Sequence, residues 1–222
     1  MEIGPGLGAL TLPLLERAGA LQVVEIDRDL AAKLRARALP GLVVHEADAL
    51  EIPLEGLLGA PPQARLRLVG NLPYNVGTPL LLRFAAHRAL VADVHAMLQK
   101  EVVDRLVAAP GTSARGRLSV VIQASFRVAP LFDVEPGAFR PAPKVRSAVV
   151  RLVPRTDAPP PRALPGIELA ARLAFANRRK TLRNNFRGTL DAGALEALGI
   201  DPGARAETLD GAAFERLGAA LG

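Results

Sequence analysis

The sequence predicts an α/β fold: a doubly wound, mostly parallel sheet with an antiparallel end, plus a small all-helical C-terminal domain. Apolar strand-like runs alternate with runs of helical periodicity over the first hundred residues, which is typical of parallel sheets. Two β-rich stretches separated by Pro-rich turns indicate the antiparallel end. A Pro-rich segment then precedes the last, helical part. We therefore expect a sheet domain over residues 1–153, a linker over 154–166 and a helical domain over 167–222.

The expected elements follow the chain in order. After a first strand that ends at Ile3, strands are expected at 21–26, 42–46, 66–70 and 92–98, and helices at 29–38, 76–89, 101–108 and 118–124. The antiparallel strands are expected at 126–129 and 147–153. The first helix of the C-terminal domain carries a basic run without acids, on which Arg179, Arg183 and Arg187 share one face at i, i+4 and i+8.

Composition excludes several classes of protein. The 222 residues are half hydrophobic and contain no Cys, which excludes a disulfide framework, a Cys-ligated zinc site and a thiol nucleophile. The three His residues show no metal-ligand spacing, so we expect no metal. No apolar run approaches the about 18 residues of a membrane span, and the start lacks a signal peptide, so we expect a cytoplasmic protein. The net charge of +6 indicates an anionic partner such as nucleic acid, or else only a solvated basic surface.

A glycine-rich loop opens the chain. Gly4, Gly6 and Gly8 join the first strand to a helix, with a spacing that differs from the Gly-x-Gly-x-x-Gly of dinucleotide sites. Glu25, at the end of the next strand, stands where a carboxylate binds the hydroxyls of a ribose. The alternative is a tight turn followed by a helix-capping acid. Glu2, just before the loop, favours a cationic ligand over a phosphate.

Two further polar segments follow later strands. Asp48 could accept a hydrogen bond from an adenine amine, or could cap a helix. The segment Gly70-Asn-Leu-Pro-Tyr-Asn75 contains the chain's one Tyr. The Asn71 side chain and a backbone carbonyl at Leu72 or Pro73 could accept hydrogen bonds from an exocyclic amine and so expose its lone pair to a methyl donor. Tyr74 would stack on the flipped base, although the same residues also suit a simple turn.

Phe139 and the basic run are the remaining candidates. Phe139 lies in a Pro-rich loop, where it would form the second face of a base sandwich or a small core contact. The basic run, comprising Arg178, Arg179, Lys180, Arg183 and Arg187, would contact RNA phosphates. A solvated amphipathic helix is the alternative to that contact.

These motifs together resemble the ribosomal RNA adenine dimethyltransferase family. The resemblance rests on Glu2–Gly8, Val24–Asp27, Ala47–Leu50 and Asn71–Tyr74, and on the later segments 97–102, 116–119, 139–147 and 175–183. The later segments look like the small-subunit branch, which dimethylates two adjacent adenosines near the 3′ end of that RNA. They look less like the erythromycin-resistance branch.

The resemblance implies a Rossmann-like methyltransferase fold, S-adenosylmethionine as cofactor, and assembling small-subunit ribosomal RNA as partner. It implies cofactor contacts at Gly4, Gly6, Glu25, Ile26, Asp48, Ala49 and Asn71. The segment Asn71, Leu72, Pro73 and Tyr74, together with Phe139, would hold the target base. We expect a monomer that does not bind membranes.

The start of the sequence differs from the family pattern. Family members carry a segment ahead of the glycine loop, with a Gln-Asn-Phe-Leu-type motif that covers the cofactor, whereas here only Met1 to Ile3 precede the loop. We therefore expect weak cofactor binding and a lowered melting temperature for these 222 residues alone. This leaves open a second function, that of a non-catalytic ribosome-assembly factor. A nicotinamide oxidoreductase is disfavoured by the glycine spacing.

Overall fold

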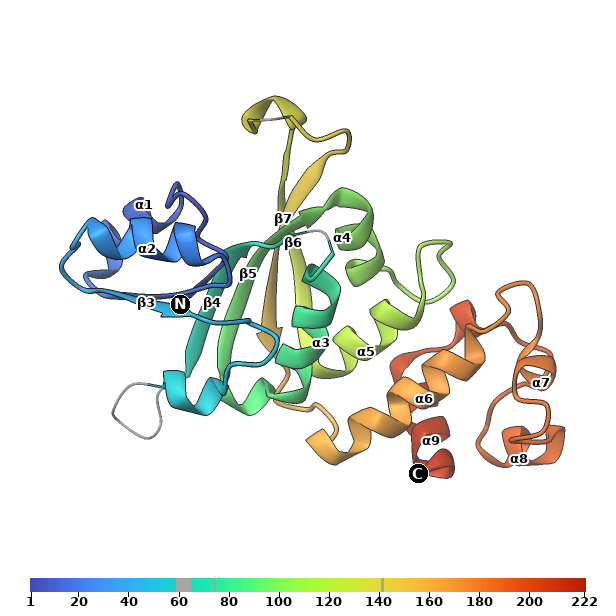
Figure 1. Cartoon of the computed structure of the whole chain (residues 1–222). Helices are drawn as coiled ribbons and strands as arrows, with labels where there is room; N and C mark the ends of the chain where they lie inside the picture. Colours follow the sequence, from blue (N-terminus) through green and yellow to red (C-terminus); the bar gives the residue numbers. More distant parts are fainter. Residues whose placement is uncertain (59–64, 74, 141) are drawn as a thin grey trace. The chain divides into compact units, whose positions relative to one another are not determined.

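A computed structural model describes residues 1–58, 65–73, 75–140 and 142–222. The chain forms two compact units (Figure 1). The sheet unit comprises Met1–Lys100 and Ala129–Pro154, and the helical unit comprises Glu101–Val128 and Arg155–Gly222. The segment Glu101–Val128 therefore groups with the C-terminal helices, a division that differs from a single boundary near residue 154.

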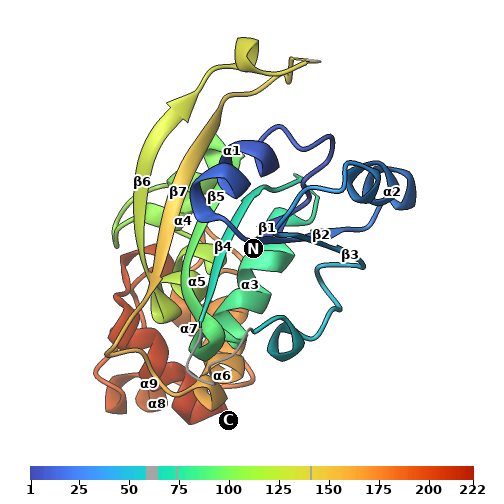
Figure 2. The same cartoon turned by 90° about the vertical axis from the view of Figure 1, so that its left-hand side faces the viewer.

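Across the described residues, seven strands form one sheet in the order β3-β2-β1-β4-β5-β7-β6 (Figure 2). The first five strands pair in parallel and β7 pairs antiparallel to β5. This confirms the predicted doubly wound sheet with an antiparallel end. Their bounds are β1 Glu2–Ile3, β2 Leu21–Glu25, β3 Leu42–Glu46, β4 Leu66–Asn71, β5 Val91–Gln99, β6 Phe126–Val134 and β7 Ser147–Pro154.

The helices of the sheet unit are placed by local signals in the sequence. Helix α1 (Thr11–Ala18) ends at Gly19, which adopts a left-handed conformation and donates its N–H to the Leu15 carbonyl. Helix α2 (Arg28–Ala36) begins after Asp27, whose carboxylate accepts two backbone N–H groups. Helix α3 (Gly77–Ala86) and short 3₁₀ turns at Leu54–Leu57, Arg88–Leu90 and Pro136–Ala138 complete this unit.

Two glycines allow the segment after β4 to lie close to its neighbours. A Cβ atom on Gly70 would stand 2.7 Å from the Ile3 carbonyl oxygen. A Cβ atom on Gly77 would stand 2.7 Å from Cδ2 of Leu98. Both distances are shorter than carbon atoms tolerate, so only glycine lets β4 and the start of α3 pack against β1 and β5.

The helical unit contains α5 (Arg117–Ser125), α6 (Leu164–Ala174), α7 (Leu182–Asn185), α8 (Ala192–Ala197) and α9 (Gly211–Leu221), and most of α4 (Lys100–Val107). Helices α6 and α9 touch backbone to backbone, because a Cβ atom on Gly166 would stand 2.5 Å from the Gly218 carbonyl oxygen. The Phe175 and Phe214 rings stack with centroids 5.9 Å apart. Within the described residues, no helix is long and apolar enough to span a bilayer.

The predicted basic helix is wrong in its extent. Helix α6 ends at Ala174 and α7 covers only Leu182–Asn185, so Arg179, Arg183 and Arg187 do not follow one helical face. The Asn185 side chain donates to the carbonyls of Ala174 and Asn177 and thereby fastens the intervening turn. Helix α6 also begins inside the expected linker, with Pro165 in its first turn, where a missing N–H costs nothing.

Candidate active site

The glycine-rich loop connects β1 to α1 at the carboxyl edge of the sheet. Gly4, Gly6 and Gly8 have φ angles of 66°, 57° and 86°, a region that other residues rarely adopt. The Gly4 N–H donates to the Val24 carbonyl at 2.9 Å, and the Arg37 guanidinium donates to the Leu7 carbonyl at 3.0 Å. The loop is therefore held from β2 and from the residue that follows α2, in a conformation in which the Gly6 N–H points to Glu25 at the end of β2.

Glu25 ends β2 beneath this loop. Only 6% of its surface is exposed, and its two carboxylate oxygens accept the N–H groups of Gly6 at 3.0 Å and Asp27 at 3.1 Å. A carboxylate offers about four acceptor positions, so Glu25 can still accept two hydroxyl groups. The helix-capping role belongs to Asp27 instead, because its Oδ1 accepts the N–H groups of Asp29 and Leu30 at the start of α2.

Glu2 is the second carboxylate beneath the loop. It is 2% exposed, and its Oε2 accepts a hydrogen bond from the Thr11 hydroxyl at 2.6 Å. Burial, which disfavours a charged carboxylate, raises its pKa, and the hydrogen bond from Thr11 opposes that rise. Deprotonation of Glu2 therefore costs free energy, and a cationic ligand nearby would offset that cost.

The turn after β3 brings Asp48 and Ala49 to the same sheet edge. The Ala47 N–H donates to the Glu25 carbonyl at 3.0 Å, which ties this turn to the end of β2. Asp48 accepts the Leu50 N–H at 2.7 Å within a turn and begins no helix, so the helix-cap alternative for Asp48 is wrong. Ile26 is 66% exposed and offers an apolar surface beside Glu25.

Arg83 is a residue of this site that the sequence analysis missed. It lies in α3, and its guanidinium donates to the backbone carbonyls of Leu50 and Ile52. It therefore fixes the residues that follow Asp48 in this turn. No signal in the sequence separates Arg83 from an ordinary solvent-facing arginine on an amphipathic helix, because its two acceptors lie more than thirty positions earlier in the chain.

Asn71 is the last residue of β4 and is exposed at the sheet edge. Leu72 is buried, and its N–H donates to the Met97 carbonyl at 3.2 Å. The Pro73 carbonyl accepts the N–H groups of Val76 and Gly77, which fixes the turn into α3. A Cβ atom on Gly4 would stand 4.0 Å from Cδ of Pro73, so the glycine loop and this turn lie next to each other. Tyr74 lies outside the described residues.

Phe139 follows the 3₁₀ turn Pro136–Ala138 in the connection between β6 and β7. It is half-buried and its N–H donates to the Pro136 carbonyl at 3.2 Å. Ser147 at the start of β7 pairs with Gln99 at the end of β5, so the connection extends beyond the carboxyl edge of the sheet (Figures 1 and 2). Phe139 is thus on the correct edge, while its contact with a base remains a prediction.

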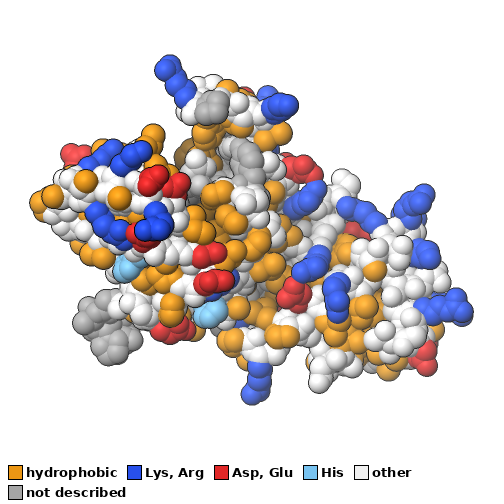
Figure 3. Space-filling model, in the orientation of Figure 1, with side chains coloured by type: hydrophobic (Ala, Val, Ile, Leu, Met, Phe, Trp, Pro, Cys, Tyr) orange, Lys and Arg blue, Asp and Glu red, His pale blue; other side chains and the backbone are white. Residues whose placement is uncertain are grey.

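The candidate RNA-binding residues divide into two groups. The Arg178 guanidinium donates to the backbone carbonyls of Ser113 and Arg115, so this side chain also fastens the α4–α5 connection. Arg179, Lys180, Arg183 and Arg187 are exposed. Figure 3 shows Lys and Arg side chains standing out from the helical unit, at the right of the view.

These residues fit S-adenosylmethionine. Glu25 retains acceptors that could bind the two ribose hydroxyls, and Asp48 retains an oxygen that could accept the adenine amine. The exposed Ile26 side chain would offer a face to the adenine ring. The positive-φ glycines would let the methionine part of the cofactor approach the backbone, and nearby acidic side chains would complement its positive charge.

Comparisons with known proteins identify the family of this chain. The family model described as "Ribosomal RNA adenine dimethylase" matches residues 1–218. "Ribosomal RNA small subunit methyltransferase A" of Aromatoleum aromaticum is 56% identical over 213 residues, covering 94% of this chain and 78% of that protein. The protein of the same name from Acidithiobacillus ferrooxidans is 56% identical over 220 residues, covering 98% of this chain and 81% of that protein.

Two solved structures are similar over almost the whole chain. A dimethyladenosine transferase from Plasmodium falciparum has a TM-score of 0.77 at 25% identity and covers 97% of this chain and 86% of its own. The 23S rRNA methyltransferase ErmE has a TM-score of 0.68 at 26% identity and covers 99% and 89%. The chain therefore belongs to the ribosomal RNA adenine dimethylase family and is an S-adenosylmethionine-dependent rRNA adenine N6,N6-dimethyltransferase.

Proposed function

We propose that this protein dimethylates the N6 amines of two adjacent adenosines near the 3′ end of small-subunit ribosomal RNA, during assembly of that subunit. It would act as a monomer in the cytoplasm. Curated relatives that share about half of its residues carry small-subunit methyltransferase names. The observation that carries the proposal is that Gly4 of the glycine loop lies next to Pro73, so that a cofactor on the loop and a base at the turn would adjoin.

The chemistry needs an amine whose lone pair faces the methyl group. When bound, S-adenosylmethionine supplies an electrophilic methyl group. In our proposal, the Asn71 side-chain oxygen accepts one hydrogen of the adenine amine and a backbone carbonyl accepts the other. The Pro73 carbonyl already accepts two N–H groups, which favours Leu72 as that second acceptor. Tyr74 and Phe139 would stack on the base. In this proposal the rate of methyl transfer is raised by positioning the amine against the methyl group, without a general base.

The distribution of charge supports RNA as the partner. Residues 1–100 carry 10 basic and 10 acidic side chains and are neutral overall. The β6–β7 part, residues 129–154, carries 4 basic against 2 acidic, and the helical unit carries 14 against 10. The net charge of +6 thus arises outside the cofactor side, where phosphates would approach Arg179, Lys180, Arg183 and Arg187.

Substitution of Asn71 tests the proposal. Asn71→Ala should bind small-subunit rRNA close to wild-type levels and should still bind S-adenosylmethionine. It should lose methyl transfer by at least about a hundredfold, the scale of one removed positioning group, which is far more than any loss of cofactor affinity. The measurement is transfer of tritiated methyl groups to small-subunit rRNA, with calorimetry and a thermal melt as controls for binding and folding. Near wild-type transfer by Asn71→Ala would contradict the mechanism. If the wild type binds the RNA and the cofactor without transfer, a non-catalytic assembly factor is the better description.

A further inference from the structure

A buried hydrogen bond lies beneath the glycine loop, between Thr11 and Glu2. Thr11 is the first residue of α1 and is fully buried, and its hydroxyl donates to Oε2 of Glu2 at 2.6 Å. A Cβ atom on Gly8 would stand 3.7 Å from the Cβ atom of Thr11, so this side chain packs against the loop. The bond therefore joins the start of α1 to β1 at the place where the loop connects them.

The Thr11 hydroxyl does not serve α1 itself. A threonine that caps a helix accepts a backbone N–H of the first turn with its hydroxyl. Here the residue before α1, Leu10, provides no side-chain cap, and the Thr11 hydroxyl points to Glu2 on β1. The first turn is closed by the backbone instead, because the Leu12 N–H donates to the Gly8 carbonyl at 3.2 Å. The hydroxyl therefore stabilises the Glu2 carboxylate.

The two oxygens of Glu2 have different surroundings. Oε2 accepts the Thr11 hydroxyl, and no hydrogen bond within the described part of the chain reaches Oε1. A carboxylate offers about four acceptor positions, so Oε1 is available to a ligand. The last torsion of a glutamate is soft when the carboxylate has no partner. Because Thr11 binds one oxygen, it fixes this torsion and with it the direction of the other oxygen.

The same hydrogen bond affects the charge of Glu2. Burial raises the pKa of Glu2, and the Thr11 hydroxyl lowers it, because a hydrogen bond donated to a carboxylate favours the ionised form. Two charged groups act on Glu2 from neighbouring positions: the amino terminus at Met1 lowers its pKa and the Glu25 carboxylate raises it. Thr11 therefore increases the fraction of Glu2 that is ionised and able to receive a cation.

We propose that Thr11 is a positioning residue of the cofactor site, which keeps the Glu2 carboxylate ionised and directs its free oxygen toward the positively charged methionine part of S-adenosylmethionine. Because Thr11 is fully buried, its hydroxyl acts through Glu2 alone. The adenosine part of the cofactor is left to Glu25 and Asp48, so Thr11 affects only ligands that carry the methionine charges. This inference rests on the proposed cofactor contacts and is independent of which adenosines are methylated.

The first test compares a charged ligand with an uncharged one. Thr11→Val keeps the shape of the side chain and removes the hydroxyl, so it should weaken binding of S-adenosylmethionine roughly tenfold, the scale of one hydrogen bond to a charged group. Binding of 5′-methylthioadenosine, which has the adenosine part without the methionine charges, should stay at the wild-type level. Thr11→Ser restores the hydroxyl and should restore the affinity for S-adenosylmethionine.

Calorimetry on the whole chain measures both affinities, and a thermal melt checks folding. Thr112→Val is the matched control, because it removes an exposed threonine hydroxyl from the helical unit and should change neither affinity. Thr11→Ala removes the same hydroxyl with less bulk, and it replaces Thr11→Val in every comparison if that variant does not fold.

The second test uses pH and a double variant. The affinity of the wild type for S-adenosylmethionine should rise with pH as Glu2 loses its proton, and this rise should move to higher pH in Thr11→Val, where Glu2 lacks the hydrogen bond that lowers its pKa. Adding Thr11→Val to Glu2→Gln should cause no further loss, because no charge remains for the hydroxyl to stabilise. The amino terminus at Met1 is the same in all variants, so its own titration cancels in these comparisons.

Three results would overturn the role of Thr11. These are equal losses of both ligands in Thr11→Val, failure of Thr11→Ser to restore affinity, and a loss in the double variant as large as that in Thr11→Val alone. Each would show that Thr11 shapes the loop and does not act through the charge of Glu2. If the wild type binds neither ligand, the proposed cofactor site fails instead.

Discussion

Glu25 and Asp27 stand two positions apart, and the structure gives them different hydrogen-bond partners. Glu25 accepts N–H groups from the glycine loop and from the turn that follows β2, whereas Asp27 caps α2. The sequence identified a carboxylate at the end of β2 but did not separate a ligand-binding acid from a capping acid. Both types of residue follow a strand and precede a helix, so only the direction of each side chain distinguishes them.

Substitutions at these two positions should separate cofactor binding from stability. Glu25→Ala should raise the dissociation constant for S-adenosylmethionine by the equivalent of about 1.5–3 kcal/mol, because the ribose hydroxyls lose a charged acceptor. Asp27→Ala should lower the free energy of unfolding by about 0.5–2 kcal/mol, the cost of a lost helix cap, with cofactor affinity nearly unchanged. Calorimetry and thermal melts on both variants give the comparison. An unchanged dissociation constant in Glu25→Ala would remove it from the site.

The buried carboxyl of Glu2 should make stability depend on pH. Because burial raises its folded-state pKa above the usual 4.5, the folded state binds the proton more tightly than the unfolded state does. The resulting stabilisation is complete below pH 4.5 and is lost as the pH rises through the folded-state pKa. Glu2→Gln keeps an acceptor for Thr11 and should raise the melting temperature near neutral pH, by about 2–4 °C per kcal/mol recovered.

This gain from Glu2→Gln should disappear in acid and should be accompanied by weaker binding of the cationic cofactor. Melting curves at several pH values, with and without S-adenosylmethionine, provide the measurement. A difference between variant and wild type that stays constant with pH would show that Glu2 is not the titrating group.

Elements with strong periodicity were predicted well, and elements ended by tertiary contacts were not. The strand at 42–46 has the predicted bounds, and α2 covers 28–36 where 29–38 was expected. The prediction of one continuous basic helix was wrong, because the Asn185 side chain donates to the carbonyls of Ala174 and Asn177 and stabilises a turn between α6 and α7. A hydrogen bond from a side chain to a carbonyl elsewhere in the chain does not change the hydrophobic periodicity of the sequence. For the same reason, the sequence did not predict the hydrogen bonds of Arg83.

The side chain of Arg83 links α3 to the turn after β3, so its loss should affect that turn. Arg83→Ala removes the donors of the Leu50 and Ile52 carbonyls and should loosen the turn that carries Asp48. We expect affinity for S-adenosylmethionine to fall roughly three- to tenfold, the scale of one net hydrogen bond. Affinity for rRNA should stay constant.

Arg172→Ala, with an exposed arginine on another helix, controls for the loss of one positive charge. Calorimetry with the cofactor and anisotropy with rRNA measure the two affinities separately. Equal losses in both would indicate a general loss of folding instead of a local change in the turn.

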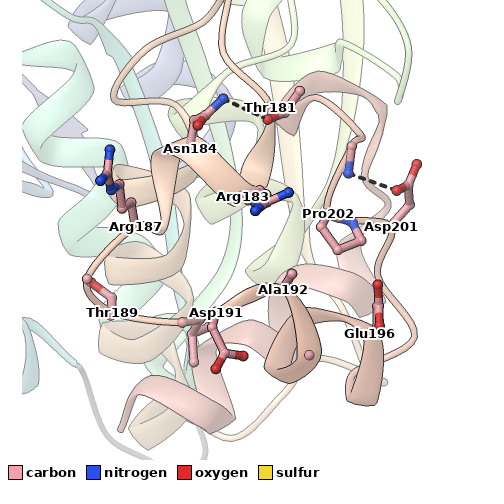
Figure 4. A pocket seen from close by; sticks show the side chains of 14 residues that line it. Thr181, Arg183, Asn184, Arg187, Thr189, Asp191, Ala192, Glu196, Asp201 and Pro202 are labelled. Carbon is pink, nitrogen blue, oxygen red and sulfur yellow. Dashed lines mark hydrogen bonds between the residues drawn. The ribbon is translucent and has the colours of Figure 1, made fainter.

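At the scale of the whole molecule, the residues proposed to bind the cofactor and those proposed to bind RNA lie on different parts of the chain. The glycine loop, Glu25, Asp48 and Asn71 all belong to the sheet unit, and Arg183 and Arg187 belong to the helical unit. The sequence predicted both kinds of chemistry from motifs and charge. It did not reveal the pocket of the helical unit, which is lined by several separate segments between Thr181 and Gly203 (Figure 4).

The central place of β1 in the sheet has a geometric consequence. It lies between β2 and β4, through the pairings Glu2–Val23, Ile3–Val24 and Glu2–Val69. Glu25 ends β2 and Asn71 ends β4, so the two proposed contact groups stand on strands that β1 separates. In our proposal, the distance between methyl donor and adenine amine is therefore fixed by the backbone hydrogen bonds of the sheet. A substitution in a loop that leaves the register of these three strands unchanged should leave that distance unchanged.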